Sequence, residues 1–284
     1  MANTQKIKQQ VTNEIIALMQ THGSDWVKPF STLCGIPTNA TTGKQYRGMN
    51  AFWLGLQGET YWATYKQWRK IGAQVISGPG SASYVTVPMV IKDRETGEKT
   101  GMFFGSKAVF SAAQVDGWQA PTVDAPDTTE VLANVDRYIA NTGADIRYNP
   151  TGGAFYQPGN DYINMPTREQ FTATSTSTAT ECFYSTTLHE LTHWTGHKSR
   201  CDRLALKNKN GRAFEELVAE IGATMQCVQL GISAETRADH AQYIANWLGA
   251  LEDNREYIFT AASKAQDAVD FIRNLQPEVV DLAA

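Results

Sequence analysis

The chain has 284 residues, of which 42% are hydrophobic and 19% are charged, and its formal net charge is −4. This balance is typical of a globular protein with a sizeable core, and it excludes the disordered and fibrous classes. Because the length exceeds that of one usual hydrophobic core, we expect two domains. Residues 1–118 hold 12 Lys and Arg against 7 Asp and Glu, a balance of +5, whereas residues 119–284 hold 13 against 22, a balance of −9. We therefore expect the two halves to meet different partners.

The cell compartment is indicated by what the sequence lacks. No run of 18 apolar residues occurs, and the stretch MANTQKIKQQVTNEII has neither the apolar region nor the cleavage site of a secretory signal. We therefore expect a cytoplasmic protein that does not contact a membrane. The four cysteines form no CxxC pair, which argues against a zinc ribbon and against a disulfide framework.

The N-terminal half predicts a mixed α+β domain over residues 1–118. Apolar residues from Ile7 to Leu18 recur at near-helical spacing and predict a helix, and residues 61–72 predict a short helix ended by a glycine. Residues 83–91 and 101–110 predict two strands joined by a polar turn. The proline-containing stretch that follows, where the charge balance changes sign, predicts a linker at residues 119–130.

The C-terminal half, residues 131–284, predicts a helix-rich domain with a small sheet. A helix ended by Gly143 begins at the end of the linker and is followed by three short strands with Gly, Pro and Asn turns between them. The low-complexity stretch 172–180 predicts a mobile loop. Four more helices are expected, at residues 181–196, 212–230, 236–252 and 255–274. The fold class is therefore α+β with two domains.

Residues 188–197 read LHELTHWTGH and hold three of the chain's five histidines. Positions four apart lie on one face of an α-helix, so His189 and His193 can aim their imidazoles at one point. In the HExxH pattern two such imidazoles ligate zinc, and the adjacent glutamate accepts a proton from water. The pattern therefore predicts His189 and His193 as metal ligands and Glu190 as the catalytic base.

A catalytic zinc site normally has three protein ligands, and the sequence offers three candidates for the last one. His197 lies where a glycine frays the helix, and the metzincin pattern needs a histidine where Ser199 stands. The predicted helix at residues 213–225 instead places Glu216 and Glu220 one turn apart on one face. One would ligate the metal and the other would fix a ligand imidazole through its second nitrogen. The residues alone leave open which glutamate has which role.

The stretch EELVAE is similar in layout to the second metal-binding helix of gluzincins such as thermolysin. That resemblance implies that Glu216 is the ligand and that Glu220 orients an imidazole. The donor set favours one divalent metal, zinc, with manganese as the alternative. The expected chemistry is metal-assisted hydrolysis of a peptide bond. The strands predicted near residues 153–166 are either an edge for an extended peptide or ordinary core sheet.

Basic and aromatic side chains alternate between residues 44 and 70. Cations that follow phosphates and rings that stack on bases are how single-stranded nucleic acid is bound. The alternative is that rings at helical spacing belong to the core, and some of the tryptophans must be buried. The predicted DNA-binding residues are Lys44, Tyr46, Arg47, Trp53, Trp62, Tyr65, Lys66, Trp68, Arg69 and Lys70.

The whole pattern resembles the ArdC antirestriction proteins of conjugative plasmids. The stretches TGKQYRGMNAFWL, YWATYKQWRKIGAQV and VFSAAQVDGW are similar to the N-terminal domain of that family, and LHELTHWTGH with FEELVAE to its zincin-like domain. The resemblance implies a domain that binds single-stranded DNA, joined to a metallopeptidase-like domain. It also implies a role in shielding incoming plasmid DNA from restriction. The partners we expect are single-stranded DNA and, for the metal site, a host restriction enzyme or another protein substrate.

Two other functions stay open at this point. The first is a binding protein whose metal is structural or vestigial, which protects DNA by coating it or by blocking the restriction enzyme. The second is a metal-dependent nuclease, which is less favoured because HExxH with a glutamate ligand rarely serves phosphodiester chemistry and because the sequence shows no two-metal carboxylate cluster.

Overall fold

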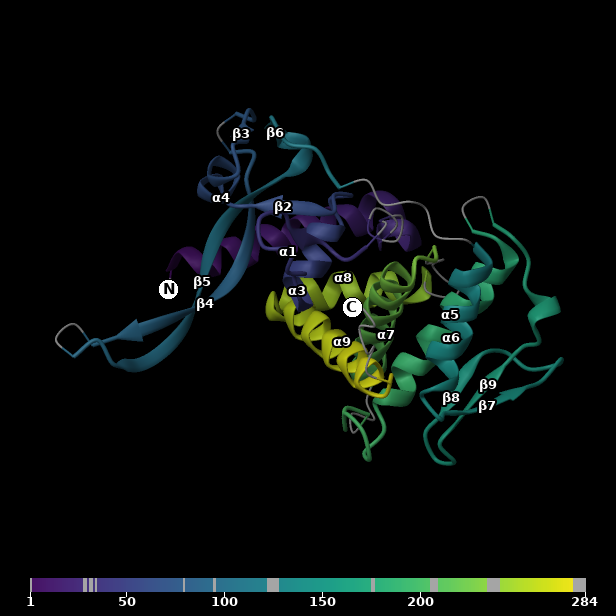
Figure 1. Ribbon diagram of the computed structural model, residues 1–284. Coiled ribbons are helices and arrows are strands. Elements are labelled where there is room, and N and C mark those ends of the chain that lie inside the picture. The colour runs from purple at the N-terminus through teal and green to yellow at the C-terminus, as the bar shows by residue number, and fades with distance from the viewer. Residues whose placement is uncertain are drawn as a thin grey trace.

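A computed structural model describes residues 2–27, 30, 33, 35–78, 80–93, 96–121, 128–174, 177–204, 209–233 and 241–277. Helices α7, α8 and α9 occupy the middle of the molecule (Figure 1). The β4–β5 hairpin projects from one side, and helices α5 and α6 lie with a small sheet on the other. None of the described helices is long and apolar enough to cross a membrane.

The N-terminal half is the expected mixture of helices and strands. A four-stranded sheet has the order β1-β2-β5-β4, and β3 and β6 form a separate two-stranded sheet. The antiparallel hairpin of β4 and β5 pairs Ser83 with Val109 near the body and Lys92 with Lys99 at its far end. The elements are α1 (Ala2–His22), η1 (Gly23–Val27), β1 (Thr38–Asn39), α3 (Gly48–Gly55), β2 (Tyr61–Ala63), α4 (Tyr65–Lys70), β3 (Gln74–Val75), β4 (Ser83–Lys92), β5 (Lys99–Ser111), η2 (Ala112–Gln114) and β6 (Val115–Asp116).

The helix predicted at residues 61–72 needs a correction at its start. Residues Tyr61–Ala63 form strand β2, in which Trp62 pairs with Ser111 of β5. The side chain of Thr64 accepts a hydrogen bond from the backbone N–H of Gln67 and so caps α4, which begins only at residue 65. The local capping signal and the burial of Trp62 in the sheet therefore outweigh the helical spacing of the aromatic residues.

The C-terminal half has the predicted order of helices and strands, but α5 begins at Thr128, within the predicted linker. Residues 122–127 of that linker and 236–240 of the helix predicted at residues 236–252 lie outside the described residues. Its sheet has the order β7-β9-β8, with β7 and β9 parallel and β8 and β9 antiparallel. The predicted loop at residues 172–180 is partly wrong, because Thr178 caps α6 and the last two residues are helical; residues 175–176 lie outside the described residues. The elements are α5 (Thr128–Ala140), β7 (Asp145–Tyr148), β8 (Phe155–Gln157), β9 (Tyr162–Met165), η3 (Arg168–Gln170), α6 (Ala179–Thr195), α7 (Lys209–Leu230), α8 (Ala241–Asp253) and α9 (Glu256–Asn274).

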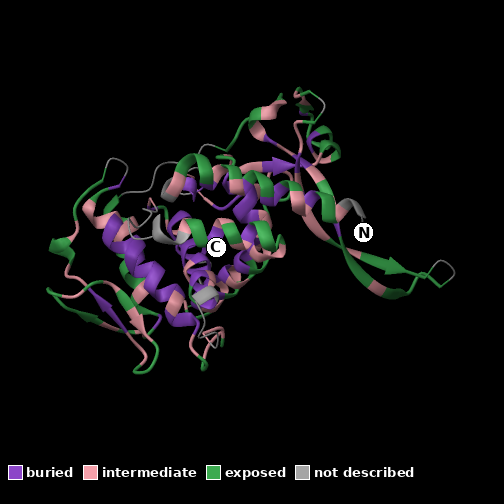
Figure 2. Cartoon of the chain, turned by 180° about the vertical axis from the view of Figure 1, so that it is seen from behind, coloured by how far each residue is buried: buried purple, intermediate pink, exposed green. Residues whose placement is uncertain are grey.

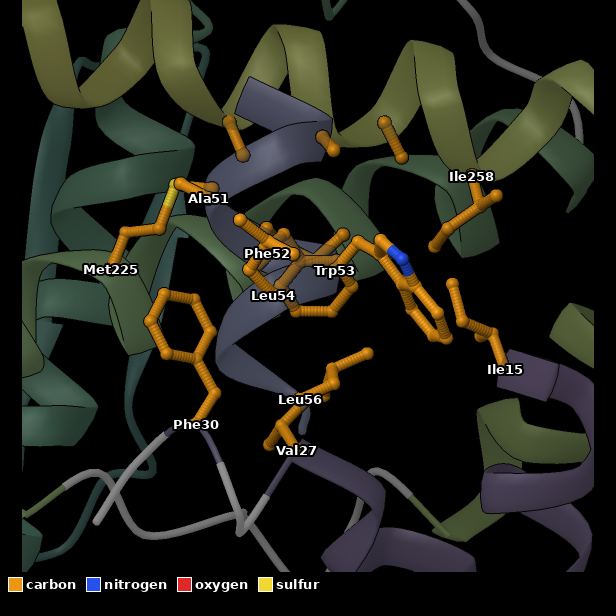
Figure 3. Packing of buried hydrophobic residues seen from close by; sticks show 14 of the residues in the cluster. Ile15, Val27, Phe30, Ala51, Phe52, Trp53, Leu54, Leu56, Met225 and Ile258 are labelled. Carbon is orange, nitrogen blue, oxygen red and sulfur yellow. The ribbon is translucent and has the colours of Figure 1, made fainter. Parts of the chain in front are cut away.

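The largest core cluster is built from both halves of the chain. Helix α3 packs in the middle of it, against residues of α1, α7 and α9 (Figure 3). Its members include Ile15, Ala51, Phe52, Leu54, Met225 and Ile258. A second cluster packs the small sheet and α5 against α6 and the C-terminal part of α7. Helix α7 therefore links the two clusters, and the N-terminal half helps to fix its position.

Helix α6 is buried along most of its length, whereas the far part of the β4–β5 hairpin is largely exposed (Figure 2). Helix α6 packs closely against α7 at Gly222, where an added Cβ would lie 2.7 Å from Cγ2 of Thr192. The hydroxyl of Thr192 donates to the carbonyl oxygen of Leu188 and accepts a hydrogen bond from Gln226. Thr192 is therefore held on both sides and cannot turn away.

We expect Gly222→Ala to lower the free energy of unfolding by about 1–3 kcal/mol, because overpacking at a fixed contact forces the helices apart. The control is Gly249→Ala on α8, where an added Cβ meets nothing within 4 Å. That variant should be neutral or more stable by about 0.5–1 kcal/mol, since alanine favours a helix over glycine. Urea unfolding of both variants measures the difference, and equal stabilities would contradict the close contact.

Candidate metal centre

Helix α6 brings His189 and His193 together as their spacing predicts. The two imidazole rings have centroids 4.7 Å apart and stand at 80° to each other. Their Nε2 atoms are 3.1 Å apart and therefore point at a common place. Of the two residues, His189 is buried at 2% exposure and His193 is partly buried.

Helix α7 supplies the third donor. Oε2 of Glu216 lies 3.4 Å from Nε2 of His189 and 3.5 Å from Nε2 of His193. A tetrahedral ion with bonds of about 2.0–2.1 Å separates its ligand atoms by about 3.3 Å. The three atoms therefore form a triangle of the right size and chemistry for one divalent ion. Among the described residues, these three form the one group of His, Cys, Asp and Glu side chains that could hold a metal.

The protonation of the site is set by the closeness of its acid and its bases. Burial alone would raise the pKa of Glu216, but the His189 and His193 imidazoles outweigh it and hold that pKa well below its ordinary value. Burial alone would lower the pKa of His193, but hydrogen bonds and charge from Glu215 and Glu216 raise it to about 10. The metal-free site therefore pairs an anionic Glu216 with a cationic His193.

We expect metal binding to release protons and to strengthen with pH. An imidazole must be neutral to ligate a metal, so the ion has to displace the proton that His193 holds below a pKa of about 10. The apparent affinity should rise by about tenfold per pH unit between pH 7 and 9. Titration calorimetry at pH 8 in buffers of different ionisation enthalpy counts the released protons. A count of zero would contradict a protonated His193 in the metal-free protein.

Behind the three donors, each imidazole faces a second carboxylate. Oε2 of Glu220 lies 3.9 Å from Nδ1 of His189. Oε1 of Glu215 lies within hydrogen-bond distance of Nδ1 of His193, at 3.2 Å. Glu216 thus occupies the metal-facing side, and Glu220 lies at the back of the first imidazole.

Two residues at this site had no signal in the sequence analysis. Glu215 precedes Glu216 and is rotated by about 100° on the helix, so it does not share a face with the Glu216 and Glu220 pair. Arg203, which binds Glu215 through both its Nε and Nη2 atoms, comes from the irregular segment between α6 and α7. Only tertiary structure brings Arg203 to Glu215, so helical periodicity cannot predict it.

The other predicted residues of the C-terminal half lie outside the group of three donors. Glu190 lies on α6 beside His189 and is buried at 2% exposure. His197 is outside the donor group, and its Nδ1 lies 2.8 Å from the hydroxyl oxygen of Ser199. Strand β8 lies at an edge of its sheet, and Phe155 on it is 43% exposed. An extended peptide could add to that edge, which stays a prediction.

The predicted DNA-binding tryptophans are all buried. Trp53, Trp62 and Trp68 are 6%, 2% and 0% exposed. The indole N–H of Trp62 donates to the carbonyl oxygen of Glu59, and that of Trp68 donates to the carbonyl oxygen of Phe110. Because stacking on a base needs an exposed ring face, this role does not fit the three indoles, and the prediction is corrected for them.

Two further residues of the predicted set are engaged within the fold. Tyr46 packs against the main core, and its hydroxyl oxygen accepts a hydrogen bond from Asn39. Arg47 forms an ion pair with Asp270 of α9.

The exposed members of the set lie on α4 and on the turn beside it. The side-chain amide of Asn39, at the start of that turn, donates to Gln67 of α4. Apart from Arg47, whose guanidinium pairs with Asp270, we call the exposed members the α4 surface: Lys44, Tyr65, Lys66, Arg69 and Lys70. Two other exposed rings of this half, Phe103 and Phe104 on β5, were not predicted.

Comparisons with known proteins identify relatives of both halves. Residues 5–115 match the N-terminal domain of the anti-restriction factor ArdC, and residues 133–264 match a zincin-like metallopeptidase domain. The chain is 34% identical to the uncharacterized protein y4eC of Sinorhizobium fredii, over 96% of this chain and 93% of that protein. It is also 34% identical to a DNA primase TraC of Escherichia coli, where 93% of this chain covers only 27% of the primase.

Solved structures give the same assignment over 94% of the chain. Crystal structures of the antirestriction protein ArdC from plasmid R388, one metal-free and one Mn(II)-bound, each superpose with a TM-score of 0.76. Each is 35% identical, over 94% of this chain and 97% of that protein. With an ArdC N-terminal domain, a zincin-like metallopeptidase domain and relatives that match along its length, this chain belongs to the ArdC family of antirestriction proteins.

Proposed function

We propose that this chain is an antirestriction protein that binds single-stranded DNA with its N-terminal domain and holds one divalent metal in a peptidase-type site. The observation that carries the proposal is the convergence of His189, His193 and Glu216, from two helices, on one point. Zinc is the favoured ion on ligand chemistry, and manganese is the alternative. The Mn(II)-bound form of the R388 protein supports a divalent ion in this family.

In this proposal, Glu216 is the ligand and Glu220 supports His189 from behind. When bound, the ion supplies Lewis-acid chemistry, polarising a carbonyl group and making water more acidic. Glu190, next to His189 on α6, accepts the proton from the attacking water and later passes it to the leaving amine. The burial of Glu190 and the imidazoles keeps bulk water away, which strengthens electrostatic interactions inside the site.

The experiment that tests this activity uses the full chain loaded with zinc or with manganese. It is incubated with unfolded protein substrates and with a restriction enzyme, and new peptide N-termini are counted. Cleavage that needs the added metal supports the peptidase reading. Full metal occupancy without cleavage supports the alternative, a DNA-coating or enzyme-blocking protein with a structural or vestigial metal. The nuclease reading is disfavoured, because the described part of the chain shows one group of side chains that could hold a metal, whereas two-metal phosphodiester chemistry needs two neighbouring ions.

The α4 surface is our proposed path for the phosphates. Its four basic side chains are exposed, and Tyr65 among them is 43% exposed and offers a ring face. Phe103 and Phe104, at 43% and 59% exposure, offer further faces for stacking on the hairpin. Cations and exposed rings together are the features that binding to single strands requires.

We expect replacement of Lys66, Arg69 and Lys70 by Ala to weaken binding to single-stranded DNA regardless of its sequence. If each contacts one phosphate, the slope of log affinity against log salt should become shallower by about 2, at about 0.7 per contact. Fluorescence anisotropy of a labelled oligonucleotide across a salt series measures both effects.

The matched control changes three basic side chains of the other domain, Arg137, Lys198 and Lys264, to Ala. Both triple variants remove three positive charges from the protein. A difference between their salt slopes therefore reports where the charges lie and not the net charge. Equal salt slopes for both variants and the unmodified chain would contradict a phosphate path on α4.

A further inference from the structure

Arg203 joins the two helices that carry the candidate metal centre. It lies in the irregular segment between α6 and α7, yet its side chain is only 5% exposed. Its Nη1 donates to the hydroxyl oxygen of Thr195 at 2.7 Å, and its Nη2 donates to the carbonyl oxygen of Thr192. The same guanidinium donates to both carboxylate oxygens of Glu215 at 2.9–3.1 Å. One side chain thus ties the last turn of α6 to the first half of α7.

The backbone around Arg203 is folded to place it there. The chain turns back over the end of α6, with the backbone N–H groups of Arg203 and Leu204 donating to the carbonyl oxygen of Gly196. Asp202 takes a left-handed conformation, with φ of 45°, at the point where the chain turns. Aspartate tolerates this region better than most residues. Backbone hydrogen bonds therefore give the segment around Arg203 a defined conformation.

The link continues to Nδ1 of His193, the ring nitrogen that faces away from the three converging donor atoms. Oε1 of Glu215 lies 3.2 Å from Nδ1 of that histidine. A carboxylate oxygen can only accept, so Nδ1 carries the proton in this pair. When the imidazole is neutral, its Nε2 lone pair is then directed at the place where the atoms of His189 and Glu216 converge. Because Arg203 holds both oxygens of Glu215, the carboxylate cannot rotate away from the ring.

We propose that Arg203 and Glu215 are positioning residues of the metal site: they fix the tautomer and ring orientation of His193 and set the spacing of α6 and α7. This inference rests on the proposed metal site and adds a support for the second histidine that is separate from Glu220. Partners of this kind change metal affinity by about 10–100-fold when they are removed. Lysine cannot replace Arg203, because an ammonium group lacks the planar fork that reaches both Glu215 oxygens and the end of α6.

The test measures zinc affinity of the full chain by competition with a chromophoric chelator, for Arg203→Lys and Glu215→Gln. Both variants should bind zinc about 10–100-fold more weakly than the unmodified chain. In the zinc-loaded protein, NMR of ¹⁵N-labelled histidine should show a slowly exchanging Nδ1 proton on His193. That signal should shift or broaden in both variants.

The control is Arg200→Lys. Arg200 makes a similar pair with Asp161 and packs on the ring of Trp194 on the same helix, but it contacts neither ligand histidine. In the presence of chelator, we expect Arg200→Lys to lower the free energy of unfolding about as much as Arg203→Lys does. Its zinc affinity and the His193 signal should stay unchanged.

The outcomes distinguish a failure of the proposed metal site from a failure of the positioning role. An unmodified chain that binds no zinc and no manganese overturns the proposed metal site itself. A chain that binds zinc while Arg203→Lys and Glu215→Gln bind it equally well overturns only the positioning role. An equal loss of affinity in Arg200→Lys would also overturn it, by showing general loosening of α6. If Arg203→Lys does not fold, Glu215→Gln, which preserves side-chain size, decides the question.

Discussion

Replacing Glu190 by Gln is expected to reduce metal-dependent peptide hydrolysis by about 10²–10⁴-fold while the metal stays bound. The change removes the proton acceptor and keeps the volume of a side chain that is 2% exposed, so the fold should hold. Glu190 is not one of the three converging donors, so the metal content per chain should not change. A peptide-cleavage assay beside elemental analysis of the same sample measures both quantities.

The control for this variant is Glu169→Gln, on an exposed residue of η3. Cleavage by Glu190→Gln at the rate of the control would contradict the assigned base. In cells, the Glu190→Gln variant also distinguishes protection by catalysis from protection by binding alone. Protection that survives in the inert variant would favour the binding-only protein, and protection that is lost with metal and fold intact would favour catalysis.

Replacing Glu216 by Ala is expected to lower metal affinity by more than about 100-fold, a larger effect than that of Glu220→Ala. Glu216 offers one of the three converging oxygen and nitrogen atoms that could hold a metal, whereas Glu220 lies 3.9 Å from Nδ1 of His189, on the other side of the ring. Loss of a supporting partner costs about 10–100-fold, and loss of a ligand costs more. Chelator competition on both variants gives the ranking. The reverse ranking would restore the other assignment that the sequence had left open.

The candidate donors could be predicted from sequence because each pair lies within one helix. The spacing of four between His189 and His193, and between Glu216 and Glu220, places each pair on one face by helical geometry alone. Which glutamate approaches the histidines depends on the packing of α6 against α7, where Gly222 allows close contact with Thr192. That packing is tertiary, and no local pattern encodes it.

In the N-terminal half, composition alone does not predict which aromatic residues are exposed. Aromatic residues mixed with basic ones are consistent both with a stacking surface and with a core beneath a charged face. Trp68 is fully buried, while Lys66, Arg69 and Lys70 of the same short helix are exposed. Spacing in a six-residue helix is too short a signal to separate these roles. The core shared by both halves could not be predicted either. The charge difference between the halves is a property of surface residues and says nothing about how buried residues pack.

The central claim is that one divalent ion binds to His189, His193 and Glu216. Crystals of the full chain grown with zinc, and with manganese, would locate the ion by its anomalous scattering. We predict a single strong peak within about 2.0–2.2 Å of Nε2 of both histidines and of a carboxylate oxygen of Glu216. A fully occupied peak elsewhere, or none near these atoms at saturating metal, would contradict it.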